Sequence, residues 1–245
     1  MLTKKYLWIK KNKNIAIFGA NGTIGSAMLA HYQNESQVYA FSRSDFDASD
    51  SNLDKILLDD YKDKTLARAA STYENDFFDK IIICIGMLHN EDFMPEKRIE
   101  DFSENQFMKT MESNTLIPTL IAKNFYKKLK KDEESTLAFL SARVGSITDN
   151  RTGGWYSYRA SKSSLNMMVK NFSIELGRYN KKLVVIGQHP GTVDSPLTQP
   201  FQKNLEDSKI FSADFSVLKL SSVIDSLSVE SSGKCIDWEG KVVSP

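Results

Sequence analysis

The sequence predicts one α/β domain, built as a doubly wound parallel sheet with helices on both faces. Short apolar segments alternate with longer stretches of helical periodicity, 41% of the residues are hydrophobic, and the length of 245 residues suits one large domain. Such alternation implies parallel strands joined by right-handed crossovers. No repeat, low-complexity tract or Gly/Ser linker divides the chain. We therefore expect residues 1–245 to form a single domain.

Five apolar segments are expected to form buried strands. Each is too short for an ordinary helix, and most of them end in Gly, Ser or Pro. They are NIAIFGA, QVYAFSRS, KIIICIG, STLAFLSA and KLVVIGQHPG, which begin at residues 14, 37, 80, 135 and 182. A weaker strand is expected at 56–58, inside an acidic segment, and a helix should follow it.

Three longer stretches are expected to form helices, because their apolar residues recur at three- and four-residue steps. They are GSAMLAHYQ from residue 25, the segment 104–131, and the segment 158–179, whose apolar stripe is Leu165, Met168, Phe172 and Leu176.

The segment 196–222 has two prolines and no clear period, so it is predicted to be a substrate loop or lid. Its apolar side chains suggest a substrate pocket without strong charge; they are Phe201, Ile210, Phe211 and Phe215.

Composition argues against several function classes. The chain has 32 basic and 31 acidic side chains, so no overall field attracts nucleic acid or an anionic membrane. No apolar run approaches the roughly 20 residues that cross a bilayer. The basic N-terminal extension, residues 1–13, leads into a short apolar stretch that glycine interrupts, which is unlike an export signal. We expect a cytoplasmic protein with a small-molecule substrate, without a nucleic-acid or membrane partner and, given the spacing of its histidines and cysteines, without a metal.

Three glycines follow the first predicted strand. Gly19, Gly22 and Gly25 lie where the strand turns into a helix. Glycine lets such a turn bend sharply and lets backbone N–H groups approach a pyrophosphate at the helix N-terminus. An ordinary loop can also contain three spaced glycines, but the position between a strand and a helix favours a Rossmann-like dinucleotide site.

The end of the second predicted strand indicates which dinucleotide binds. Arg43 lies where such domains contact the adenosine ribose, and an arginine there can neutralise the additional phosphate of NADP. NADP is therefore the predicted cofactor, and NAD is the alternative. Arg43 can also be a solvated side chain that pairs with Asp45 or Asp47.

The segment WYSYRASK contains two tyrosines and a lysine. Tyr158 and Lys162 are four residues apart and share a helix face, whereas Tyr156 is six residues from Lys162 and diverges from it. A tyrosine has an ordinary pKa of about 10, and a nearby lysine lowers that pKa by stabilising the phenolate. Tyr158 and Lys162 are the candidate catalytic pair.

These motifs together resemble the short-chain dehydrogenase/reductase family. The glycine turn, YRASK and HPGTVDSP carry the resemblance, which extends from about Asn14 to the C-terminus. The stretch from Ser141 to Met168 is most similar to the subgroup of C-factor-like proteins and sniffer-type carbonyl reductases.

The resemblance implies roles for individual residues. Tyr158 would protonate the substrate carbonyl, Lys162 would lower the Tyr158 pKa and hold the nicotinamide ribose, and Asn114 would retain a water for proton relay. Asp59 would lie near the adenine, with Asp60 as the alternative. The implied cofactor-binding residues are Gly19, Asn21, Gly22, Thr23, Ile24, Gly25, Arg43, Asp59, Gly86, Lys162, Pro190, Gly191, Thr192 and Val193.

The sequence departs from the family pattern in three places. Thr23 replaces the middle glycine of the turn, and the fourth predicted strand ends CIGM instead of Asn-Asn-Ala-Gly. The substrate-orienting serine is replaced by Ala142. Ser141 points to the opposite face of a strand unless the backbone bulges, so Ser141, Ser146 and a site without serine all stay open.

Two functions follow from these observations. The first is an NADP(H)-dependent reductase of a ketone or aldehyde, with hydride transfer from the cofactor and Tyr158 as acid or base. The second is a nucleotide-binding signalling or scaffold protein that has lost turnover. Ala142 favours the second function, whereas Asn114, Tyr158 and Lys162 together favour the first. The resemblance also implies a homo-oligomer, a dimer or tetramer, formed through the helices at 104–131 and 157–178.

Overall fold

The computed structural model describes residues 13–48 and 50–245. Most of the predicted N-terminal extension, residues 1–12, lies outside the described residues, and Lys13 already belongs to the first strand. In the described part of the chain, no helix has an apolar run long enough to cross a bilayer.

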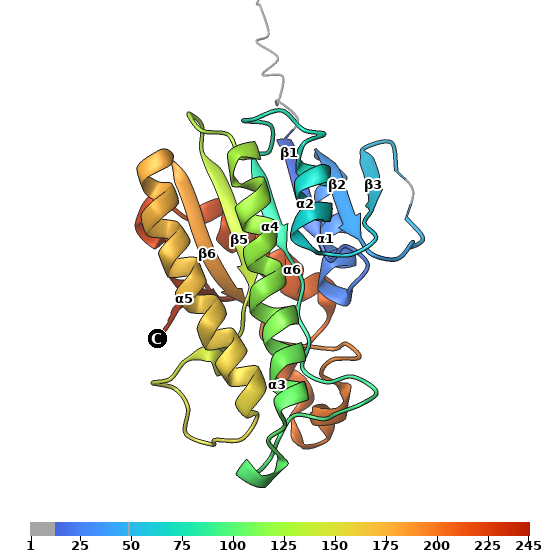
Figure 1. Ribbon diagram of the computed structural model, residues 1–245, viewed down its shortest axis with the longest axis vertical. Coiled ribbons are helices and arrows are strands. Elements are labelled where there is room, and N and C mark those ends of the chain that lie inside the picture. Colours follow the sequence, from blue (N-terminus) through green and yellow to red (C-terminus); the bar gives the residue numbers. More distant parts are fainter. Residues whose placement is uncertain (1–12, 49) are drawn as a thin grey trace, which may run out of the picture.

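A mostly parallel sheet forms the centre of the domain (Figure 1). Within the described residues it has eight strands in the order β10-β9-β6-β5-β4-β1-β2-β3, and only the β9–β10 pair is antiparallel. The order reverses between β1 and β4, which is where open α/β sheets bind ligands. The strands are β1 Lys13–Phe18, β2 Ser36–Ser42, β3 Leu53–Leu57, β4 Lys80–Ile83, β5 Ser135–Leu140, β6 Leu183–His189, β9 Cys235–Asp237 and β10 Val242–Val243.

Helices cover both faces of the sheet. On one face lie α2, α4 and α5, and on the other lie α1 and α6, each with its own apolar core against the strands (Figure 1). The helix α3 continues through a π-helical segment, η2, into α4. The helices are α1 Thr23–Tyr32, α2 Asp63–Ala70, α3 Glu104–Met111, η2 Glu112–Leu116, α4 Ile117–Phe125, α5 Tyr156–Tyr179 and α6 Ala213–Ser226.

Short elements complete the chain between these helices and strands. A separate parallel pair consists of β7 Thr192–Val193 and β8 Ile210–Phe211. The 3-10 segments are η1 Ile99–Asp101, η3 Tyr126–Lys128, η4 Arg143–Gly145, η5 Gln199–Asn204, η6 Asp207–Lys209 and η7 Val229–Ser231.

The predicted α/β architecture is confirmed, with one correction to its elements. All five strong strands form, and the weak strand forms as β3. The segment 196–222 is not one loop, because its last ten residues belong to helix α6. Val217, Leu220 and Ile224 are buried against the sheet, and Ser212 caps the helix by accepting the Phe215 N–H. Only residues 196–212 remain a candidate substrate segment.

The glycine turn packs helix α1 closely against the end of β1. Gly19 has a φ of 78°, a left-handed conformation that favours glycine. A Cβ atom on Gly25 would lie 2.1 Å from the carbonyl oxygen of Gly19, so a side chain there would push the helix away from the turn. The N-terminus of α1 therefore opens directly beside the carboxyl end of β1.

Candidate active site

A hollow of about 360 Å³ lies at the carboxyl ends of the strands and contains the predicted catalytic pair. Tyr158 and Lys162 enter it from α5, and the turn before α1 and the segment after β6 form other parts of its wall. Of the predicted site residues it is lined by Gly22, Thr23, Ile24, Gly86, Ser141, Tyr158, Lys162, Pro190, Gly191 and Val193.

A second hollow, of about 630 Å³, adjoins the first. The two share Gly22, Cys84 and Gly86 in their walls. The second hollow also contains the remaining predicted residues of the adenosine end, namely Gly19, Asn21, Arg43 and Asp59. The structure thus brings together most of the residues that the sequence assigned to one long ligand.

Arg43 is an exposed residue that lines the second hollow, and its guanidinium carbon lies 5.6 Å from the centre of the Tyr61 ring. Asp45 does not neutralise it, because Asp45 pairs with Lys55 at 3.5 Å. An exposed arginine beside an aromatic ring is suited to a phosphate, which it can bind with two parallel hydrogen bonds.

The two candidate aspartates have different surroundings. Asp59 lines the second hollow and pairs with Arg68 at 3.1 Å on the surface. Asp60 accepts the N–H of Lys62, the residue before α2, at 2.9 Å. Hydrogen bonds from Thr65 and Lys62 lower the pKa of Asp60. The geometry therefore assigns Asp60 to the start of α2 and leaves Asp59 as the candidate near the ligand.

Tyr158 and Lys162 lie side by side on α5, as the four-residue spacing predicts. The Lys162 ammonium donates to the carbonyl oxygen of Leu140 at 2.9 Å and lies 5.9 Å from the centre of the Tyr158 ring. Burial raises the pKa of Tyr158 to about 12 and lowers the pKa of Lys162 to about 8. Burial thus opposes ionisation of both side chains.

Asn114 lies in the π-helical segment η2, and its side chain is fully buried. It accepts the Met87 N–H at 2.6 Å and donates to the Met87 carbonyl at 2.7 Å. It also donates to the Ser161 hydroxyl at 2.9 Å. Asn114 therefore connects the loop after β4 to the helix that carries Tyr158 and Lys162, behind the wall of the hollow.

The three serine alternatives are separated by the structure. Ser146 lies outside the hollow, where its hydroxyl donates to the Pro245 carbonyl at 3.3 Å and accepts the Asp149 N–H at 3.0 Å. Ser141 lines the hollow, but its hydroxyl donates to Asn166 Oδ1 at 2.6 Å. Ala142 lines the hollow as well. The hydroxyl of Ser146 is therefore not placed for a substrate, and that of Ser141 is already engaged.

Two other predicted residues support the hollow without lining it. Gly25 permits the close packing of α1, and Thr192 pairs with Ile210 of β8.

His189, which the sequence did not single out, lines the hollow at the end of β6. Burial lowers its pKa to about 4, so the imidazole is neutral at pH 7. Its position directly before Pro190, at the start of HPGTVDSP, was the feature of the sequence that could have identified it as a site residue.

The apolar residues assigned to the substrate segment separate into two groups. The Phe201 ring lies 5.0 Å from that of Trp155 and 5.8 Å from that of His89, at the side of the hollow where Trp155 contacts Tyr158. Phe211 and Phe215 instead contact Trp238, and Ile210 pairs with Thr192; none of the four residues lines the hollow itself. Phe201 remains the best candidate of the four for contact with a substrate.

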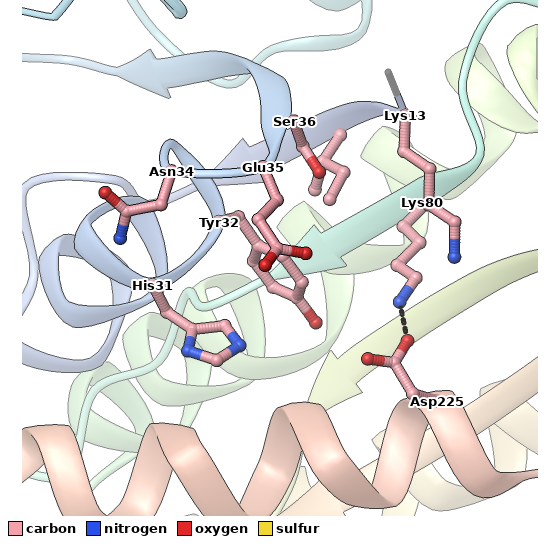
Figure 2. Close-up of a pocket in the computed structure, with 9 residues that line it drawn as sticks. Lys13, His31, Tyr32, Asn34, Glu35, Ser36, Lys80 and Asp225 are labelled. Carbon is pink, nitrogen blue, oxygen red and sulfur yellow. Dashed lines mark hydrogen bonds and ion pairs between the residues drawn. The ribbon is translucent and has the colours of Figure 1, made fainter. Parts of the chain in front are cut away.

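A further hollow, of about 510 Å³, lies at the opposite, amino end of the sheet (Figure 2). Its wall includes Lys80 of β4, which forms an ion pair with Asp225 of α6, and Tyr32 of α1. None of the predicted site residues lies there. The candidate chemistry is confined to the carboxyl ends of the strands.

The sequence is similar to those of two known proteins. The chain is 32% identical over 135 residues to the C-signal protein of Myxococcus xanthus, covering 55% of this chain and 76% of that protein. It is also 32% identical over 126 residues to 1-hydroxy-2-glutathionyl-2-methyl-3-butene dehydrogenase of a Rhodococcus species, covering 51% of this chain and 53% of that one.

Solved structures show the same fold. The carbonyl reductase Sniffer of D. melanogaster has a TM-score of 0.79 at 21% identity and covers 96% of this chain and 100% of its own. The NADPH-bound carbonyl reductase from chicken fatty liver also has a TM-score of 0.79, at 22% identity, with 96% and 99% covered. The short chain dehydrogenase family model matches residues 13–206. The chain therefore belongs to the short-chain dehydrogenase family.

Proposed function

We propose that this protein is an NADP(H)-dependent oxidoreductase that reduces a ketone or an aldehyde by hydride transfer. The observation that carries the proposal is the convergence of Tyr158 and Lys162 on a hollow that adjoins the one containing Arg43. A carbonyl reductase of the same fold is described with NADPH bound, and a Burkholderia multivorans short-chain dehydrogenase/reductase with NADP bound. The proposed cofactor agrees with the position of Arg43.

The residues present suit a dinucleotide. Gly86 lines both hollows, and a Cβ atom on it would lie 3.2 Å from the Lys162 ammonium and 3.4 Å from Asn114 Oδ1, so a side chain there would crowd the candidate catalytic lysine. The turn from Gly19 to Gly25 would hold the pyrophosphate at the N-terminus of α1, and Arg43 the ribose phosphate. When bound, the cofactor supplies the hydride.

Tyr158 is the proposed proton donor to the carbonyl oxygen. Burial holds the Tyr158 pKa at about 12, well above neutral pH. A positive charge on Lys162 favours the phenolate and so makes Tyr158 a better acid. Lys162 can act in this way only while it is protonated, and its pKa of about 8 leaves it charged at neutral pH.

The substrate is proposed to be uncharged near its carbonyl. Among the described residues that line the smaller hollow, Lys162 is the one lysine or arginine, and no aspartate or glutamate lines it. His189 is neutral at pH 7 because burial lowers its pKa to about 4. The rest of the wall is uncharged: it includes the apolar residues Leu140, Ala142 and Val193 and the hydroxyl-bearing residues Thr23, Ser141, Ser195 and Thr198. A cationic group on the substrate would have no carboxylate partner there, and an anionic group would draw the Lys162 ammonium away from the Leu140 carbonyl and from Tyr158.

The second candidate is a nucleotide-binding protein without turnover. It is favoured by Ala142 in the hollow and by the engagement of the Ser141 hydroxyl with Asn166. Under this alternative the cofactor still binds, but no carbonyl substrate is reduced.

Titration with NADPH and NADH, followed through tryptophan fluorescence, tests which cofactor the protein binds. A panel of uncharged ketones and aldehydes then tests whether it reduces a carbonyl.

Tyr158→Phe should abolish reduction and retain NADPH binding. Tyr156→Phe is the matched control, because Tyr156 is on the exposed side of the same turn, and it should retain activity. Equal turnover in Tyr158→Phe and the wild type would refute the proposed mechanism. NADPH binding without any turnover would support the second candidate.

A further inference from the structure

Glu96 is a buried carboxylate in the loop between β4 and η1. Its residue is 2% exposed, although glutamate is rarely buried without a partner. The two carboxylate oxygens accept the Ser157 backbone N–H at 3.2 and 3.3 Å, and one also accepts the Ser157 hydroxyl. All of these bonds are to the first turn of α5.

Helix α5 has no side-chain cap of its own. The residue before it is Trp155, which has a left-handed backbone with a φ of 51° and makes no side-chain capping bond. The Trp155 N–H donates to the backbone carbonyl of Glu96 at 2.5 Å. Glu96 thus satisfies N–H groups on both sides of the helix start, and its negative charge is favourable beside the positive end of the helix dipole.

This cap lies next to the proposed chemistry. Ser157 directly precedes Tyr158, and the next turn of the helix is held by Asn114, which donates to the Ser161 hydroxyl at 2.9 Å. Asn114 is in turn bound to Met87, in the same loop as Glu96. The loop therefore holds the catalytic turn of α5 at two successive points.

We propose that Glu96 is a positioning residue, which fixes the first turn of α5 so that the Tyr158 hydroxyl meets the substrate carbonyl. The inference rests on the proposed reductase function. A bulky residue in the left-handed region is unfavourable, and such a conformation persists where surrounding contacts hold it. Loss of the Glu96 carboxylate removes its bonds to Ser157, while the backbone bond to the Trp155 N–H can stay, and Tyr158 then moves with the loosened first turn of the helix.

The test compares Glu96→Ala, Glu96→Gln and Glu100→Gln in the full-length protein. Glu100 is an exposed glutamate at η1, a few residues further along the chain, and is the matched control. We expect Glu96→Ala to lower kcat by about 10- to 100-fold, because small misplacements of a reacting group cost this much. The Kd for NADPH should change less than about threefold. Glu96→Gln retains an oxygen acceptor for the Ser157 N–H and should recover part of kcat, and Glu100→Gln should match the wild type.

A purely structural role gives a different pattern, which thermal unfolding and circular dichroism identify. If Glu96→Ala lowers Tm but keeps the wild-type kcat per folded molecule, the positioning role is refuted. A parallel loss of kcat and NADPH binding, without recovery in Glu96→Gln, refutes it as well. Failure of the reductase proposal is distinguishable, because the wild-type protein itself would then reduce none of the carbonyl substrates.

Discussion

The Lys162 ammonium is anchored to the end of β5, where it donates to the Leu140 carbonyl at 2.9 Å, and lies 5.9 Å from the centre of the Tyr158 ring. The same side chain is 3% exposed, so its charge is held away from water. A buried ammonium with one carbonyl partner is costly for folding. The catalytic arrangement is therefore obtained at the expense of stability.

Replacing this lysine should stabilise the protein while it abolishes activity. Burial lowers the Lys162 pKa from 10.5 to about 8, so at pH 7 the folded state carries a charge that the unfolded state accommodates better. Lys162→Met removes that charge but leaves the Leu140 carbonyl without its donor, so we expect a net gain of about 1–2 kcal/mol in unfolding free energy at pH 7. Urea unfolding of the two proteins measures the difference.

The pH dependence of that gain provides its control. Between about pH 8 and 10.5 the folded wild type binds fewer protons at Lys162 than the unfolded chain, so its stability rises with pH relative to the variant. The advantage of Lys162→Met should therefore shrink across this window. A gain that does not depend on pH, or a loss of stability at pH 7, would show that the lysine charge is not the cause.

Arg43 should determine the preference between the two dinucleotides. Its exposed side chain lines the larger hollow, and Asp45 is paired with Lys55 instead. Arg43→Ala should weaken NADPH binding by about 10- to 100-fold, because charge-assisted hydrogen bonds contribute about 1.5–3 kcal/mol each. NADH binding should change little, since NADH lacks the additional phosphate.

Fluorescence titration with both nucleotides measures this preference. Arg98→Ala is the control, because Arg98 is also an exposed arginine but pairs with Asp101 and lines neither hollow. A wild-type protein that binds NADH more tightly than NADPH would contradict the assignment of Arg43 but not the fold.

Ser146 should matter for stability and not for turnover. Its buried hydroxyl bonds the Pro245 carbonyl and the Asp149 N–H, away from the hollow. Ser146→Ala removes both bonds, but the Pro245 carbonyl keeps the Thr148 N–H and both partner residues are exposed, so we expect a loss of about 0.5–1.5 kcal/mol in unfolding free energy. Turnover per folded molecule should stay within about twofold of the wild type. A larger loss of kcat with unchanged stability would return Ser146 to the list of catalytic candidates.

The sequence was sufficient for the parts of the fold that local periodicity determines. Each buried strand is visible as one short apolar run, and the pairing of Tyr158 with Lys162 is visible as a four-residue spacing within one segment. The structure contains both features. Helix α6 was missed although Val217, Leu220 and Ile224 have helical spacing, because the prolines and aromatic residues before it obscure the pattern. Strands β9 and β10 have three and two residues, which is too few for any period.

The remaining site features depend on contacts between distant segments. Glu96 and Ser157 are 61 residues apart, and no spacing rule connects a loop glutamate with the start of a particular helix. The direction of the Ser146 hydroxyl depends on Pro245, which is 99 residues away. Such partners become visible only after the chain has folded.

Self-association remains a proposal, and the exposed apolar residues of two helices show where to test it. Met167 and Ile174 on α5 are 61% and 49% exposed, and their spacing of seven places them on one face. The neighbouring α3 exposes Met108, and the two helices run side by side on one face of the molecule (Figure 1). Apolar groups at such positions are stabilised when a second copy covers them.

Substituting Met167 and Ile174 together by Asp should convert a dimer or tetramer to smaller species, as measured by sedimentation velocity. Leu218→Asp is the matched control, because Leu218 is 57% exposed but lies on α6, at the opposite face of the sheet. A charge in a covered apolar interface lacks a partner and opposes association, whereas the same charge on a solvated face has little effect. An oligomer that withstands the double substitution but dissociates in Leu218→Asp would place the interface on the α6 side. A wild-type monomer at micromolar concentration would contradict self-association altogether.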